Sequence, residues 1–213
     1  MANTNTPSGL QVIRAGGAYS FNAQGNLYSV PTTDSTNAYY LNDAVKITGG
    51  SSVEGVPNIV KAAGTDILLG SLQAIYPVYP QASLEGSTSP QLGVTYIPAA
   101  KPQAYFVLVN DDFSTIYMIQ DDGITTAKLT AAYANANSSL TVTNGATPTS
   151  ASATVLLSSS FDTTISLNIK LQGLVQKNLG ASGGNEYGAY AKYQCRINTA
   201  FLTPNGSTGA TAA

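Results

Sequence analysis

Apolar and polar residues alternate at a period of two in several short segments, and this pattern predicts β-strands. The clearest alternation covers residues 165–171, and a second covers residues 190–197. Further short apolar runs are separated by turn residues such as Gly, Asn, Asp and Ser. They cover residues 39–47, 56–62, 67–75, 94–97, 105–109, 115–120, 140–142 and 154–157. Strands at this spacing are typical of sandwiches and barrels, so we predict an all-β protein with a small β-barrel or β-sandwich core.

One segment fits a helix. In residues 126–135, Leu129, Ala132 and Tyr133 recur at the spacing of a helical face. The Thr and Asn residues around them are weak helix formers. We therefore expect at most one short helix.

The two ends of the chain differ from the middle. Residues 1–37 mix Gly, Asn, Thr and Ser with large side chains that follow no long period, which predicts an extended N-terminal arm. Residues 38–202 are expected to form the core, and residues 203–213 a flexible C-terminal tail. The arm supplies the candidate protein-interaction residues, which are Leu10, Val12, Ile13, Arg14, Tyr19, Phe21, Leu27 and Tyr28.

Few charged residues are present, and this limits the classes of partner. Charged residues make up 9% of the chain and the net charge is −2, whereas Ser, Thr and Asn together account for 61 of 213 residues. With no basic run to neutralise phosphates, nucleic acid is not an expected partner. Neutral hydroxyls and amides cost less to bury than charges, so such a surface suits contact with other proteins.

Neither a membrane span nor a signal peptide is expected. The apolar runs are far shorter than the roughly 20 residues that cross a bilayer. The N-terminal residues have neither the basic nor the apolar region of an export signal. We therefore expect synthesis in a cytoplasm and no membrane association.

The chemistry available to the chain is narrow. It contains no histidine, which removes the commonest general base and the commonest zinc ligand. The single cysteine, Cys195, is interpreted as a packed apolar side chain. The acidic pairs Asp111-Asp112 and Asp121-Asp122 flank one predicted strand and are interpreted as turn residues. We expect no enzymatic activity, no cofactor and no metal site.

Several segments, in order along the chain, resemble one family. They are residues 1–14, 27–31, 42–47, 63–70, 105–111, 118–122 and 191–198. Together they resemble the capsid decoration (cement) and head structural proteins of tailed bacteriophages, and residues 43–70 resemble the small "β-tulip" modules of such proteins. The resemblance implies a homo-oligomer on the capsid surface of the virion, with a trimer favoured over a dimer, and an arm that pairs with the major capsid protein.

The expected function is therefore that of a capsid decoration protein, which binds the outside of a phage head and stabilises contacts between major capsid proteins. Two alternatives remain open. One is another structural protein of the virion, such as a tail tube, fibre or minor head protein. The other is a carbohydrate-binding module.

Overall fold

The computed structural model describes residues 3–14, 25–79, 94–124, 126–143, 151–175 and 184–201. The described part consists of short strands and connecting turns, so the prediction of an all-β protein is confirmed. The segment expected to form a helix contains only one 3₁₀ turn, Ala131–Tyr133. A second 3₁₀ turn covers Ser158–Ser160.

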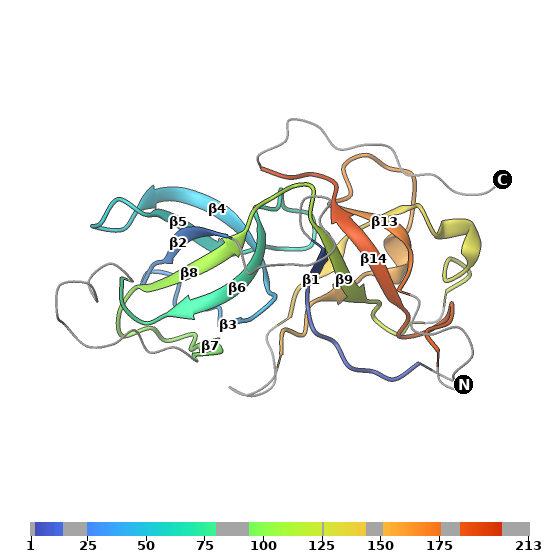
Figure 1. Ribbon diagram of the computed structural model, residues 1–213, viewed down its shortest axis with the longest axis horizontal. Coiled ribbons are helices and arrows are strands. Elements are labelled where there is room, and N and C mark those ends of the chain that lie inside the picture. Colours follow the sequence, from blue (N-terminus) through green and yellow to red (C-terminus); the bar gives the residue numbers. More distant parts are fainter. Residues whose placement is uncertain are drawn as a thin grey trace.

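Five strands form a closed ring on one side of the molecule (Figure 1). In order around the ring they are β2 (Asn26–Val30), β5 (Pro57–Lys61), β4 (Ala44–Ser51), β6 (Gly70–Tyr76) and β8 (Tyr105–Asn110). Strand β8 pairs back to β2 in antiparallel fashion, and β2 pairs with β5 in parallel. Alternate side chains of these strands point inward and form one apolar core, which includes Val30, Ile59, Leu72 and Val107.

A five-stranded antiparallel sheet forms the other side of the molecule (Figure 1). Its order is β1 (Gln11–Arg14), β9 (Ile116–Gln120), β14 (Lys192–Ile197), β13 (Ile169–Leu174) and β10 (Asn137–Ser138). It packs over a second apolar core that contains Tyr117, Phe161, Tyr193 and Cys195. Two further strand pairs are β3 (Tyr39–Tyr40) with β7 (Tyr96–Ile97), and β11 (Leu140–Thr141) with β12 (Val155–Leu156).

The described residues of the expected N-terminal arm include two strands that pair within the chain. Strand β1 pairs with β9 at the edge of the five-stranded sheet, and β2 closes the barrel against β8. Leu10 is completely buried in the second core. Leu10, Val12 and Tyr28 of this segment therefore pack against apolar side chains of their own chain. Residues 15–24 and the expected tail, residues 203–213, lie outside the described residues.

The strongest alternation in the sequence is only partly a strand. Strand β13 begins at Ile169, whereas residues 165–168 form a turn with Ile165 half-exposed. The Asn198 side-chain amide donates to the carbonyls of Ile165 and Leu167, at 3.0 and 2.8 Å. These bonds satisfy two backbone carbonyls of the turn without a partner strand. The sequence alternation therefore begins before the strand does.

Hydrogen bonds between loops join the two halves. The backbone N–H of Leu10 donates to the carbonyl of Asn42 at 2.8 Å. The Ser71 hydroxyl of β6 donates to the carbonyl of Leu10 at 2.6 Å. The backbone of Leu10, just before β1, is thus held against the barrel, while the Leu10 side chain packs in the second core.

Candidate functional site

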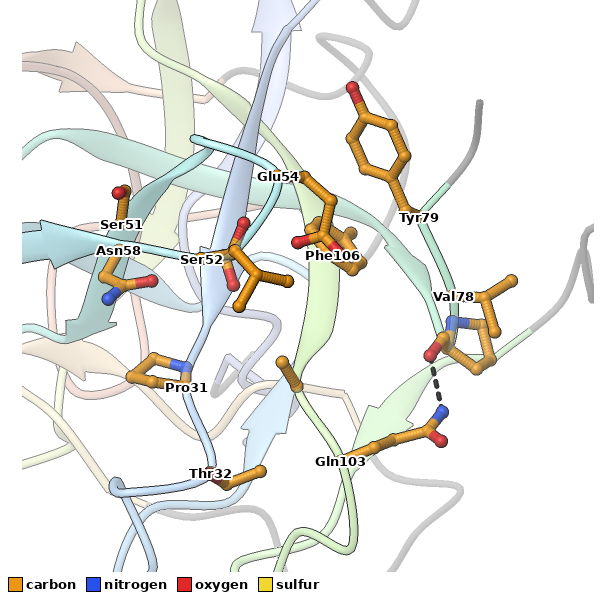
Figure 2. Close-up of a pocket in the computed structure, with 14 residues that line it drawn as sticks. Pro31, Thr32, Ser51, Ser52, Glu54, Asn58, Val78, Tyr79, Gln103 and Phe106 are labelled. Atoms are coloured by element: carbon orange, nitrogen blue, oxygen red, sulfur yellow. Dashed lines mark hydrogen bonds between the residues drawn. The ribbon is translucent and has the colours of Figure 1, made fainter. Parts of the chain in front are cut away.

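A cleft of about 510 Å³ lies against the outer face of the barrel (Figure 2). Its floor comes from strands β2, β5 and β8. Its walls come from the tip of the β4–β5 hairpin, from the residues that follow β2 and β6, and from the residues that precede β8. The volume falls in the range of about 300–1,000 Å³ that is usual for small-molecule sites.

The floor is a row of three side chains on neighbouring strands. Ser29 of β2 lies opposite Asn58 of β5 in the parallel pairing, and opposite Phe106 of β8 in the antiparallel pairing. Tyr28 and Val30, which flank Ser29, point into the barrel core. Because neighbouring residues of a strand point to opposite faces, Ser29 is on the outside of the barrel. The same alternation places Asn58 and Phe106 outside, beside Ile59 and Val107 of the core.

Two polar atoms of this row have no hydrogen-bond partner. The Ser29 hydroxyl and the Asn58 side-chain carbonyl are both buried and unpaired. Ser29 is completely buried. A buried unpaired polar group costs about 1–3 kcal/mol, so native proteins keep few of them. Two residues that line the cleft therefore carry one unpaired donor and two unpaired acceptors, which are covered from solvent in the free protein.

Aromatic and apolar side chains form one wall. The rings of Tyr79 and Phe106 meet edge to face, with their centroids 5.2 Å apart. Figure 2 shows Tyr79 beside Val78 on the side of the cleft opposite Asn58. The Gln103 side chain donates to the carbonyl of Pro77 at 2.5 Å, which ties the start of β8 to the end of β6.

The hairpin tip forms the opposite rim. Val53 at this tip is 99% exposed, and Glu54 next to it is also exposed. Among the described residues that line the cleft, none is basic and Glu54 is the only carboxylate. The site is therefore close to neutral, and it offers no charge partner to a phosphate or sulfate group.

A group of charged side chains lies inside the molecule, away from the cleft. The ammonium group of Lys61 is 2.8 Å from the carboxylate of Asp43, and their side chains are 4% and 0% exposed. The same ammonium donates to the carbonyl of Ala38 at 3.0 Å. The carboxylate of Asp43 also accepts from the hydroxyl of Ser152, which lies 109 residues later in the sequence. Burial raises the pKa of Asp43, and the interaction with Lys61 opposes that rise.

A second ion pair stabilises the loop before β3. The Lys101 ammonium lies 3.9 Å from the Asp34 carboxylate and 2.8 Å from the carbonyl of Asn37. Burial alone would raise the pKa of Asp34, but hydrogen bonds from Tyr39 and Asn37 outweigh it, so the pKa lies below its usual value. The hydroxyl of Tyr39 accepts from the backbone N–H of Lys61 at 3.0 Å, which links the two pairs.

Both acidic pairs have structural hydrogen bonds. Asp111 accepts from the Tyr28 hydroxyl at 2.7 Å, and Asp112 accepts from the N–H of Ser114 at 2.8 Å. Asp121 is completely buried and accepts from the backbone N–H groups of Gly123, Tyr190 and Ala191, at 2.7, 3.0 and 2.6 Å. Asp112 and Asp121 each accept from a backbone N–H two residues further on, as turn aspartates do, whereas the bonds of Asp111 to Tyr28 and of Asp121 to Tyr190 and Ala191 join distant segments. The pairs flank β9, so they do not meet in one site.

The candidate interaction residues are distributed through the fold. Leu10 is buried, Val12 packs against the same core, and Tyr28 is part of the barrel core. Ile13 and Leu27 are half-buried, whereas Arg14 is exposed. Tyr19 and Phe21 lie outside the described residues. The structure does not bring these residues together on one surface, and Leu10 and Tyr28 are buried within the chain.

The sequence alone did not indicate this cleft, because its three floor residues are far apart in the chain. Ser29, Asn58 and Phe106 become neighbours only through the strand order and register of the barrel. One signal was present: Ser29 and Asn58 are polar residues between apolar neighbours in short strands. Their meeting could not be read from that pattern.

In the part of the chain that the structure describes, no three His, Cys, Asp or Glu side chains come together as a metal site would require. None of the described helices has the length and apolar character needed to cross a membrane. Comparisons with protein-family models, with curated proteins and with solved structures find no match. Any account of function therefore depends on the residues themselves.

Proposed function

We propose that this chain is a non-enzymatic structural protein of a virus particle, and specifically a capsid decoration protein. In this role it binds the outer surface of a phage head as a homo-oligomer and stabilises contacts between major capsid proteins. The resemblance of residues 1–14, 42–47 and 63–70 to such proteins supports this assignment. The structure adds an argument from the distribution of charge.

The carrying observation is that several of the few charged side chains are buried inside the molecule. Lys61, Lys101, Asp43 and Asp121 are all at most 8% exposed. Since charged residues make up only 9% of the chain, the burial of these four leaves few ions at the surface. Covering such a surface with another protein carries a small desolvation cost, because few ions have to leave water.

Exposed apolar side chains give a candidate place for the contact. Ile67 is 59% exposed and Phe201 is 52% exposed. The N–H of Phe201 donates to the carbonyl of Leu68 at 2.8 Å, so the two segments that carry these side chains lie side by side. Aromatic and aliphatic side chains of this kind are the usual anchors of protein interfaces.

The copy number in purified particles tests the proposal. Hundreds of copies per particle, measured as a mass ratio to the major capsid protein, are expected for decoration. A dozen or fewer would instead indicate a tail, fibre or minor head protein. Light scattering of the isolated protein should give a trimer.

A surface variant tests the place of contact. Phe201→Ser should weaken binding to capsids that lack this protein by at least tenfold, about 1.4 kcal/mol, without lowering the melting temperature. Phe113→Ser is the matched control, since Phe113 is also exposed but lies at a different turn. Equal binding by both variants would place the contact elsewhere.

A further inference from the structure

We infer that the cleft on the outer face of the barrel is a binding site for a short neutral saccharide. The inference starts from the row Asn58, Ser29 and Phe106, where an amide, a hydroxyl and an aromatic ring lie side by side on three strands. It is independent of the proposed attachment to a capsid, because it concerns a different surface and is tested on the isolated protein.

The unpaired atoms define what the ligand must offer. The Asn58 side-chain carbonyl can only accept a hydrogen bond, while the Ser29 hydroxyl can both donate and accept. A sugar hydroxyl has the same dual capacity, so a pair of neighbouring hydroxyls can satisfy both atoms. A purely apolar ligand would leave them unpaired at a cost of about 1–3 kcal/mol each.

The aromatic wall and the near-neutral lining of the cleft narrow the class of ligand further. The partly buried ring of Tyr79, which packs edge to face on the 5% exposed Phe106, offers aromatic surface in the cleft that suits the apolar C–H face of a sugar ring. Glu54 lines the cleft at the tip of the β4–β5 hairpin, on the rim opposite the aromatic wall. Glu54 can accept from a hydroxyl at this rim, and the absence of basic side chains among the described lining residues disfavours anionic ligands.

The site also predicts an unusual relation between binding and stability. Because the Ser29 hydroxyl is unpaired and buried, removing it should not destabilise the free protein. Binding groups that are kept at the expense of stability are typical of functional sites. A hydroxyl retained for folding would behave in the opposite way.

Nuclear magnetic resonance titration of the full chain tests the inference. The probes are glucose, galactose, mannose, N-acetylglucosamine and their β-1,4-linked disaccharides, each at up to about 20 mM, since single sugars bind weakly. At least one is expected to shift the backbone signals of Ser29, Asn58 and Phe106. Inorganic phosphate and N-acetylneuraminic acid are the anionic comparisons and should leave these signals unchanged.

Two variants and a control complete the test. Ser29→Ala and Asn58→Ala should each weaken the strongest saccharide at least tenfold, with the melting temperature of Ser29→Ala equal to or above that of the unmodified protein. Phe113→Ala, an exposed aromatic outside the cleft, should bind normally. The inference is overturned if no saccharide shifts the floor signals, if the anions shift them more strongly, or if Ser29→Ala lowers the melting temperature and leaves affinity unchanged.

Discussion

The ammonium group of Lys61 lies 2.8 Å from the carboxylate of Asp43, and both side chains are buried. Taking two charges out of water costs several kcal/mol per ion, and their attraction repays this only when further hydrogen bonds are present. Those bonds come from Ser152 and the backbone of Tyr40 to Asp43, and from Lys61 to the carbonyl of Ala38. The pair therefore connects the end of β5 to the residue before β4 and, through Ser152, to the segment that precedes β12.

Removing one member of this pair should destabilise the protein strongly. Lys61→Met leaves Asp43 buried without its cation, and we expect a loss of about 3–5 kcal/mol in the free energy of unfolding. Lys46→Met is the matched control, because its pair with Asp66 is partly exposed and should contribute about 0–1 kcal/mol. Urea unfolding of both variants measures the difference. Similar losses in the two would show that burial of the Lys61 pair adds nothing.

The stability should fall in acid, in part through Asp34. Its pKa in the folded protein lies below the ordinary value of 3.8, because hydrogen bonds from Tyr39 and Asn37 outweigh burial. A lowered folded pKa means that the contribution is complete above the unfolded pKa and disappears as the pH falls through the folded one. The stability difference between the unmodified protein and Asp34→Asn should be constant from about pH 7 to about pH 5, and shrink below about pH 4.

Urea unfolding over this pH range measures the effect. Glu54→Gln serves as the control, because Glu54 is exposed at a hairpin tip and accepts no described hydrogen bond. A difference between the unmodified protein and Asp34→Asn that is independent of pH would show that the carboxylate of Asp34 contributes no charge-dependent stability.

The first strand should be part of the cooperative fold. Leu10 is completely buried in the same core as Tyr117 and Cys195, so Leu10→Ala is expected to cost about 2–5 kcal/mol. Val53→Ala changes an apolar side chain that is 99% exposed and should leave stability unchanged. Thermal melts of the two variants give the comparison. A stable Leu10→Ala variant would restore the idea of an independent arm.

Cys195 should be unreactive in the folded protein. It is completely buried, and burial raises the pKa of its thiol, so the reactive thiolate is disfavoured. A thiol reagent should modify it only after unfolding. Cys195→Ser should leave binding to particles unchanged while costing about 1–3 kcal/mol of stability, because a hydroxyl is placed in an apolar core. Rapid labelling of the native protein would contradict the buried position.

The sequence predicted the strand-rich fold because most strands show local alternation or turn residues. It failed for β1 and β2, since Gly9 and Gly25 lie beside them and obscure the strand pattern. In the structure those glycines have a packing role. A Cβ on Gly9 would lie 2.3 Å from the carbonyl oxygen of Asn42, and one on Gly25 would lie 2.6 Å from that of Val109. Without side chains, these two glycines let neighbouring backbone segments come close. In the sequence, the many glycines of this region had instead suggested a loose arm.

The candidate site depended on information that a local pattern does not hold. Register decides which residues of β2, β5 and β8 become neighbours, and a shift by one residue would turn Ser29 into the core. The pairing of Ser29 with both Asn58 and Phe106 follows from the closed strand order. Only the completed barrel specifies the cleft.

Several paired strands are far apart in the sequence, and this separation affects how the chain can fold during synthesis on the ribosome. Strand β2 is made about 80 residues before its partner β8, and β9 about 75 residues before β14. At about 5–20 residues per second, β2 waits roughly 4–16 s for β8, its antiparallel partner, whereas its parallel partner β5 follows much sooner. During this delay its apolar residues are available to chaperones. The five-stranded sheet cannot be completed before residue 197, the end of β14, has been synthesised. A chain that stops earlier therefore cannot complete the fold.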